Sequence, residues 1–123
     1  MKTSSAKNKG RLLCKVVKKL VLDYYPSLEE DDIKVTSSGA TGEDLSFSPK
    51  ARKVLPLSIE CKSRNRISVY AWLDQAGTNA GDYIPMVVAR GNNKRPIAII
   101  DLEDLFDLLK ENKKNEIKKN LDD

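Results

Sequence analysis

The sequence predicts a mixed α/β domain in which one central sheet of about five strands is flanked by helices, in the order αβββαββα. Three observations carry this prediction. Apolar residues recur at helical spacing in three stretches, short apolar runs that suit strands lie between them, and turns rich in glycine, proline or asparagine separate them. The chain has 123 residues, which is enough for one core and too few for two independent domains.

The first helix is predicted at residues 10–25. Its apolar residues form one stripe with basic residues on the flanks, and Pro26 closes the helix. A short strand at 33–35 follows. The small residues and two glycines at 37–42 predict a flexible loop, which leads into a strand at 44–47.

The strongest strand candidate spans residues 55–62 and follows a predicted turn at 48–50. Successive side chains of a strand point to opposite faces. One face of this strand therefore carries Leu57, Ile59 and Cys61, and the other carries Ser58, Glu60 and Lys62.

The second half of the chain predicts two strands between two helices. Ser68 is expected to cap a helix at 69–79, whose buried stripe is Val69, Trp72, Leu73 and Ala76. The elements after it are strands at 84–89 and 96–101, joined by a hairpin at 90–95, and a last helix from Leu102.

The domain boundaries follow from composition. Residues 1–8 are polar and small and predict a flexible basic arm, and residues 9–110 form the folded domain. Residues 111–123 form a charged tail, which either extends the last helix or frays.

The composition excludes several classes of protein. There is no histidine, which excludes Ser-His-Asp and Cys-His catalysis and the usual zinc sites. Cys14 and Cys61 lack the spacing of a metal pair and are too few for a disulfide framework, so we expect buried free thiols. No apolar run is long enough to span a bilayer and no signal peptide follows the basic start, so we expect a cytoplasmic protein without a membrane partner.

Charge is segregated along the chain, whose formal net charge is +4. Basic residues cluster at 7–19, 50–53, 62–66 and 90–95, whereas acidic residues gather at 29–32 and from residue 101 onward. Each basic cluster by itself is typical of an ordinary solvated turn. Together, the four clusters predict a positive surface that binds the phosphate backbone of nucleic acid.

Asp44, Glu60 and Lys62 form the candidate catalytic group. Asp44 begins one strand and Glu60 lies on the next, so the two carboxylates can reach one hard cation. Such ligands suit Mg²⁺, with Mn²⁺ as a substitute, and the backbone carbonyl of Cys61 could add another oxygen. Lys62 could orient or deprotonate the attacking water, or neutralise a phosphate. The alternative is a solvated strand surface with a cross-strand ion pair.

The same residues carry a resemblance to a known family. Gly42-Glu43-Asp44-Leu45, followed by Ile59-Glu60-Cys61-Lys62-Ser63-Arg64, resembles the core of the PD-(D/E)XK nuclease superfamily. The second run and the opening Lys9-Gly10-Arg11 are similar to archaeal-type Holliday junction resolvases. The likeness extends in order from residue 9 to residue 109.

The resemblance implies a restriction-endonuclease-like core in residues 9–110, which would make this a nuclease domain. It implies a magnesium-dependent, structure-selective endodeoxyribonuclease that hydrolyses phosphodiester bonds. Asp44 and Glu60 would be its metal ligands and Lys62 its catalytic lysine. Gln75 would match a polar residue on the second helix that helps to bind DNA or metal, although an ordinary exposed glutamine is equally consistent with the sequence.

Two further positions bear on the resemblance. Ser37 or Ser38 would match a loop serine that contacts the scissile region in those resolvases. The resolvases usually have a glutamate one turn into the first helix, where this chain has Cys14. Either the third carboxylate is dispensable, or Glu29 or Glu30 supplies it, or activity is weak.

DNA is the expected partner, as four-way junctions or other branches. Contacts to the DNA backbone are expected from Lys9, Arg11, Ser37, Lys50, Arg52, Lys53, Arg64 and Arg66. Symmetric cutting of two strands requires two sites, so we expect a homodimer. Its interface would use the second helix, with Tyr70 and Trp72, or the last strand and helix, and core packing is the alternative for Trp72.

Two other functions stay open. The chain could be another nuclease of the same superfamily, of repair or restriction type, that cuts linear duplex as readily as junctions. It could instead be a non-catalytic nucleic-acid-binding module that keeps the fold without binding metal, as Cys14 in place of the family glutamate would suggest.

Overall fold

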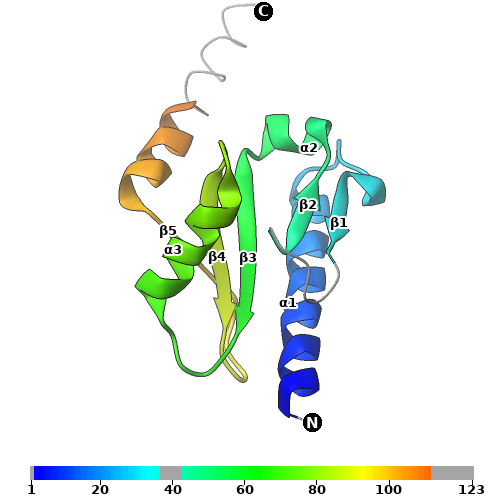
Figure 1. Ribbon diagram of the computed structural model, residues 1–123. Coiled ribbons are helices and arrows are strands. Elements are labelled where there is room, and N and C mark those ends of the chain that lie inside the picture. The colour runs from blue at the N-terminus through cyan, green and yellow to red at the C-terminus, as the bar shows by residue number, and fades with distance from the viewer. Residues whose placement is uncertain (1, 37–42, 112–123) are drawn as a thin grey trace, which may run out of the picture.

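A computed structural model describes residues 2–36 and 43–111 of the chain. The elements, in order, are α1 (Lys2–Tyr24), η1 (Glu30–Asp32), β1 (Ile33–Val35), β2 (Leu45–Phe47), α2 (Pro49–Val54), β3 (Leu57–Ser63), α3 (Val69–Ala80), β4 (Ile84–Arg90) and β5 (Ile97–Ile100) (Figure 1). Residues 102–111 are also helical. The fold is therefore mixed α/β, as the sequence predicts.

The described strands form two sheets rather than the single sheet that the sequence predicts. β1 pairs antiparallel with β2, and β3 pairs parallel with β4, which pairs antiparallel with β5. The two sheets meet where the Asp44 N–H donates to the Ile59 carbonyl at 3.1 Å. β2 is three residues long and gives way to α2 at Pro49, so its pairing does not continue along β3.

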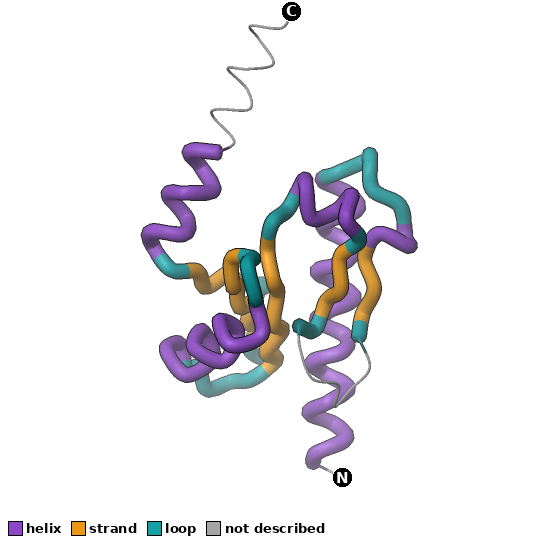
Figure 2. The backbone as a smooth tube through the Cα atoms, turned by 45° about the horizontal axis from the view of Figure 1, so that its top comes forward, coloured by secondary structure: helices purple, strands orange, loops and turns teal. Residues whose placement is uncertain are grey.

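The two faces of β3 are covered by different helices. α3 connects β3 to the parallel strand β4 and packs on one face, whereas α1 lies on the other side of β3 (Figure 2). On the α1 side, Leu13 and Val17 are buried together with Ile59 and Cys61 in the main apolar core. The alternation of β3 thus separates an apolar face from a polar one.

α1 differs from its prediction in length and in the width of its buried stripe. It begins at Lys2 and so includes residues that the sequence assigns to an arm over 1–8. One row of apolar residues, including Leu13 and Val17, is buried, while Leu12 and Leu20 are exposed. α1 packs with one side against β1 and β3, so the second apolar row of the predicted stripe stays outside.

The predicted turn at 48–50 is wrong, because these residues lead into helix α2. The Ser48 hydroxyl accepts a hydrogen bond from the Ala51 N–H at 3.1 Å, and Pro49 occupies the first turn. Ser48 also donates to the Asp32 carboxylate at 2.6 Å, which ties α2 to η1. A serine followed by proline is a common helix start, so the signal was present in the sequence.

The second half of the chain follows the prediction with small shifts. Ser68 precedes α3, but its side chain makes no capping hydrogen bond, and Val69 is exposed rather than buried. Trp72 and Leu73 are half-buried and Ala76 is fully buried. The buried stripe of α3 therefore begins one turn later than predicted.

The helix at residues 102–111 leaves much of its apolar surface open. Leu102, Phe106 and Leu109 are exposed, whereas Leu108 packs against the core. The predicted tail lies outside the described residues from 112 onward. Within residues 2–36 and 43–111, no helix combines the length and the apolar character that a bilayer crossing requires.

Candidate active site

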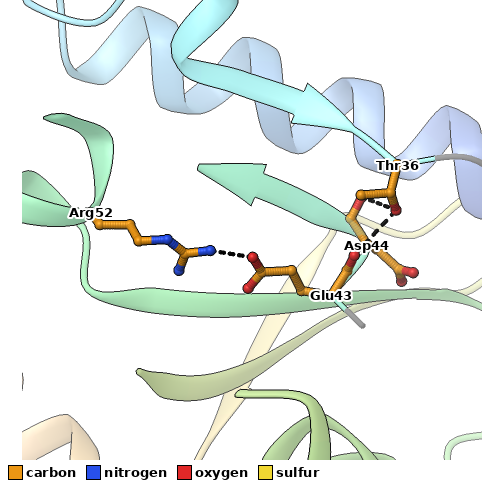
Figure 3. A network of polar contacts seen from close by, with 4 residues as sticks. All are labelled: Thr36, Glu43, Asp44 and Arg52. Atoms are coloured by element: carbon orange, nitrogen blue, oxygen red, sulfur yellow. Dashed lines mark hydrogen bonds and ion pairs between the residues drawn. The ribbon is translucent and has the colours of Figure 1, made fainter. Parts of the chain in front are cut away.

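Asp44 is fixed against β3 by its backbone and by its side chain. Its N–H donates to the Ile59 carbonyl, and its Oδ2 accepts from the Cys61 N–H at 2.8 Å. The Thr36 hydroxyl bonds to the Asp44 carbonyl at 3.0 Å, which anchors the segment from the β1 side (Figure 3). The carboxylate is half-buried and is held over the middle of β3.

Glu60 is a buried carboxyl on β3, and Asp44 is hydrogen-bonded to the residues on either side of it, Ile59 and Cys61. Its side chain is 4% exposed, and Oε1 accepts from Asn79 Nδ2 at 2.9 Å. Burial is the main reason that the pKa of Glu60 is raised to about 7. The nearby Asp44 carboxyl raises this pKa further, whereas the hydrogen bond from Asn79 and the charge of Lys62 lower it. The charge of Asp44 therefore adds to the cost of ionising the buried Glu60.

Lys62 lies two residues beyond Glu60 on the same face of β3. Its Nζ is 3.2 Å from Gln75 Oε1 and donates a hydrogen bond to it. The sequence analysis names Gln75 as a candidate site residue, and in the structure its side chain contacts Lys62 in the exposed part of the site. Lys62 is half-buried, and its ammonium group is held by this exposed hydrogen bond, near enough to Glu60 for its charge to lower the pKa of that carboxyl.

Asn79 is the site residue that the sequence analysis missed. Two residues of a strand rise about 6.6 Å, and four residues of a helix rise about 6.0 Å. Residues 60 and 62 on β3 therefore match residues 79 and 75 on α3, which runs back along the strand. Gln75 and Asn79 are spaced as neighbours on one helix face, which was the available signal.

The donor set fits a hard divalent cation. One carboxyl group comes from Asp44, just before β2, and the other from the buried Glu60 on β3, and the chain contains no histidine. A cation between them would offset both the burial of Glu60 and its repulsion by Asp44. The predicted ligand role of the Cys61 carbonyl stays a prediction, since the contact that joins Cys61 to Asp44 uses its N–H.

Cys14 and Cys61 lie on the other side of Asp44, toward α1. Both are buried free thiols, as predicted. Their Sγ atoms and a carboxylate oxygen of Asp44 all lie within 4.8 Å of one another. A hydrogen bond with the Cys14 thiol, together with burial, raises the pKa of the Cys61 thiol well above its usual range.

Glu29 and Glu30 do not supply a third carboxylate. Ile33 pairs with Phe47, so η1 lies at the end of β2 that is remote from Asp44. The Glu30 carboxylate pairs with Lys18 at 3.1 Å. The side chain that α1 directs toward Asp44 is Cys14, which has no oxygen to offer.

Arg52, which the sequence predicts as a DNA contact, is mostly buried and paired with other residues of the protein. Its guanidinium forms an ion pair with Glu43 and stacks 4.2 Å from the centre of the Tyr83 ring. Figure 3 shows Glu43 pointing to Arg52 and Asp44 pointing away from it, as expected for neighbours on an extended chain. With side chains 19% and 16% exposed, this ion pair packs α2 against the start of β2.

The other basic residues predicted to bind DNA are exposed. They are Lys9, Arg11, Lys50, Lys53, Arg64 and Arg66. α2, with Lys50 and Lys53, precedes β3, and Arg64 and Arg66 follow it, so these four basic residues lie toward opposite ends of a strand of about 20 Å. Ser37 and Ser38 lie outside the described residues.

Comparisons of the chain with protein-family models, with curated proteins and with solved structures give no match. The function is therefore inferred from the geometry of the site and from the residues in it.

Proposed function

We propose that this chain is a magnesium-dependent, structure-selective endodeoxyribonuclease that hydrolyses phosphodiester bonds in Holliday junctions or related branched DNA. The observation that carries the proposal is that Asp44 is hydrogen-bonded to β3 at Ile59 and at Cys61, on either side of the buried Glu60, with Lys62 further along the same strand face as Glu60. Buried carboxyl pairs that resist joint ionisation are costly, and they are typical of sites that bind a cation or transfer protons.

The residues divide the chemistry between them. Asp44 and Glu60 would hold Mg²⁺, or Mn²⁺ in its place. When bound, such an ion polarises a phosphodiester and makes a coordinated water more acidic. Lys62 places a positive charge beside the carboxyl pair, where it can neutralise a phosphate oxygen or orient the attacking water. Gln75 restricts the lysine by its hydrogen bond and so limits the positions of that charge.

Asn79 keeps Glu60 ready to bind a cation. Its amide donates to Oε1 and therefore favours the ionised carboxylate against the effect of burial. Without this donor, a cation would have to displace a more firmly held proton. Asn79 is therefore a positioning residue in the proposal.

The basic residues suit contacts to the DNA backbone. Exposed cations at both ends of β3 would let a strand cross the carboxyl pair while its phosphates are neutralised on either side. Such contacts read shape and charge rather than sequence. Lys53→Ala should weaken DNA binding and reduce its salt dependence by about one counterion, whereas Arg52→Ala should mainly destabilise the fold.

Cutting both strands of a junction symmetrically requires a second copy of the site, so we include a homodimer in the proposal. The exposed apolar residues of the helix at 102–111 and Ile97 on the edge strand β5 offer one candidate surface. Tyr70 on α3 is 84% exposed and offers another.

A cleavage assay on a panel of DNA substrates tests the proposal. The wild type should nick a labelled four-way junction in the presence of Mg²⁺ and cut a linear duplex of the same sequence more slowly. Asp44→Asn and Lys62→Ala should abolish nicking. The matched controls Asp31→Asn and Lys34→Ala change exposed residues outside the site and should retain it.

The same panel separates the alternatives. Equal cutting of junction and linear duplex would replace the proposal with a repair-type or restriction-type nuclease. Tight binding of DNA without cutting in Mg²⁺ or Mn²⁺ would favour a non-catalytic binding module, which the absence of an oxygen donor at Cys14 supports. Equal nicking by wild type and Asp44→Asn would overturn the assignment of the site.

A further inference from the structure

A second group of potential ligand atoms lies on the α1 side of Asp44. Cys14 comes from α1 and Cys61 from β3, and both are buried at 4% and 6% exposure. Cys61 alternates with Glu60 and Lys62, so its thiol faces away from α3. The two Sγ atoms and an Asp44 oxygen lie within 4.8 Å of one another, which is a donor set of two sulfurs and one oxygen.

The spacing suits a small tetrahedral ion. Zinc binds thiolate sulfur at about 2.3 Å, so two sulfurs on one ion are about 3.8 Å apart. The two sulfur atoms already lie within 4.8 Å of each other, so they need to approach by about 1 Å at most. The Cys61 N–H holds Asp44 Oδ2 at 2.8 Å and so orients the carboxylate from the outset.

The chemistry of the donors selects the ion. Thiolates favour soft or borderline ions such as Zn²⁺ and Cd²⁺, whereas Mg²⁺ prefers oxygen. The carboxyl pair of Asp44 and Glu60 has the opposite preference. Asp44 therefore stands between a hard site on its α3 side and a thiophilic site on its α1 side.

We propose that Cys14, Cys61 and Asp44 form a binding site for a thiophilic divalent cation of the zinc class. The ion forms bonds to both sulfurs and to one carboxylate oxygen, the two thiol protons leave to solvent, and a fourth position stays open to water. The site is distinct from the carboxyl pair but shares Asp44 with it. Occupation of the thiophilic site draws Asp44 away from Glu60, so zinc inhibits magnesium-dependent cleavage; this consequence rests on the proposed function.

Titration of the reduced full-length chain with Cd²⁺ tests the site without any activity assay. Thiolate–cadmium bonds give a charge-transfer absorption in the ultraviolet, and the chain has two cysteines, so a band must arise from them. The wild type should show a band that saturates at one equivalent of Cd²⁺. Cys14→Ala and Cys61→Ala should each weaken binding by at least about 10-fold, Asp44→Asn should weaken it too, and Glu60→Gln should retain it.

Two outcomes overturn the proposal. One is a wild-type chain without a band at stoichiometric Cd²⁺, a result that needs no variant to fold. The other is a band that Cys14→Ala or Cys14→Ser leaves at full strength, with circular dichroism confirming that the variant is folded.

Zinc inhibition provides the functional arm. Zn²⁺ should slow junction cleavage by the wild type in the presence of Mg²⁺. Cys14→Ala should need a Zn²⁺ concentration at least about 10-fold higher for the same inhibition. Each rate is compared with the rate of the same protein in Mg²⁺ alone. A chain that cuts DNA but gives no cadmium band refutes the thiophilic site and leaves the nuclease proposal standing. A chain that gives the band but never cuts DNA supports the thiophilic site and refutes the nuclease proposal.

Discussion

The two faces of β3 are built from alternate residues of one strand and have opposite properties. On the α1 face, Ile59 and Cys61 are buried among apolar side chains and a thiol. On the α3 face, Glu60 is buried to a similar degree, but its neighbours are the Asp44 carboxyl and the Asn79 amide. Equal burial therefore stabilises the fold on one face and imposes an electrostatic cost on the other.

This difference indicates where the molecule is specialised. A strand surface selected for stability alone would carry apolar residues under α3, as it does under α1. Instead, the helix that covers the polar face presents Gln75 and Asn79, which partner Lys62 and Glu60. The polar face is thus organised by specific hydrogen bonds. Substitutions on this face should mainly change the rate of cleavage, whereas substitutions on the apolar face should mainly lower stability.

The largest expected contrast is in activity. Glu60→Gln should lower the rate of junction cleavage by about 10²–10³-fold, because it removes the charge that would stabilise the transition state through the bound ion. Ile59→Val on the neighbouring position should cost about 1 kcal/mol of stability and leave the cleavage rate within a few-fold. Initial rates at saturating Mg²⁺ check both, and similar losses in the two variants would contradict the division between the faces.

A larger truncation on the apolar face should act through stability. Ile59 is 2% exposed, so Ile59→Ala should lower the free energy of unfolding by about 2–5 kcal/mol through lost burial and the cavity left behind. Urea denaturation followed by circular dichroism measures the change. A loss below about 1 kcal/mol would mean that the α1 face is not the core of the fold.

The polar face should make stability depend on pH. The pKa of Glu60 is about 7 in the folded chain, against an ordinary value of 4.5. Between these values the folded state keeps a proton that the unfolded state has released, so stability is greatest below pH 4.5 and falls as pH rises through 7. The raised pKa corresponds to about 3 kcal/mol.

Glu60→Gln should remove this dependence. Without divalent ions, the variant should gain stability relative to the wild type at pH 8 and gain nothing at pH 4, with Asp31→Asn as the exposed control. Denaturation curves at several pH values give the slope. An unchanged slope in Glu60→Gln would show that another group titrates in this range.

Asn79 should matter more when Glu60 is ionised. Asn79→Ala leaves a buried carboxylate without its donor and should cost about 1–3 kcal/mol at pH 8, with a smaller loss at pH 5. The acid limb of the pH–rate profile should move to higher pH, because the lost hydrogen bond favoured the ionised form. Thr78→Ala, on the exposed neighbour, serves as the control, and equal effects of the two would refute the role of Asn79.

The smallest effect is expected at Gln75. Its hydrogen bond with Lys62 is exposed, so Gln75→Ala should raise the activation free energy of cleavage by about 0.5–1 kcal/mol. The cleavage rate should therefore fall a few-fold, and the free energy of unfolding should change little. Gln75→Glu should keep the contact as an ion pair and change the pH profile instead. Full activity of Gln75→Ala would reduce this residue to an ordinary exposed glutamine.

The sequence predicted features that depend on local periodicity. The alternation of β3 placed Glu60 and Lys62 on one face, and helical spacing located both ends of α3 and the C-terminal end of α1 to within one residue. The start of α1 was missed, because the helix begins at Lys2 and not at residue 10. The missed helix α2 was also a local matter, since Ser48 and Pro49 form a recognisable start.

Features that depend on tertiary packing were not predictable from the sequence. Arg52 belongs to a basic cluster, yet its guanidinium is mostly buried between Glu43 and Tyr83. Neither residue belongs to α2, the helix that carries Arg52. The pairing of Asn79 with Glu60 depends on the register between α3 and β3, and the separation into two sheets depends on where β2 leaves β3. Periodicity carries no information on such long-range contacts.

A crystal of the full-length chain soaked in manganese, with anomalous scattering used to locate the ion, tests the central proposal most directly. The expected result is a peak between the carboxyl groups of Asp44 and Glu60, lost in crystals of Asp44→Asn. A map without a peak at this pair, while Asp44 keeps its hydrogen bonds to Ile59 and Cys61 on either side of Glu60, would contradict a shared cation and with it the proposed nuclease activity.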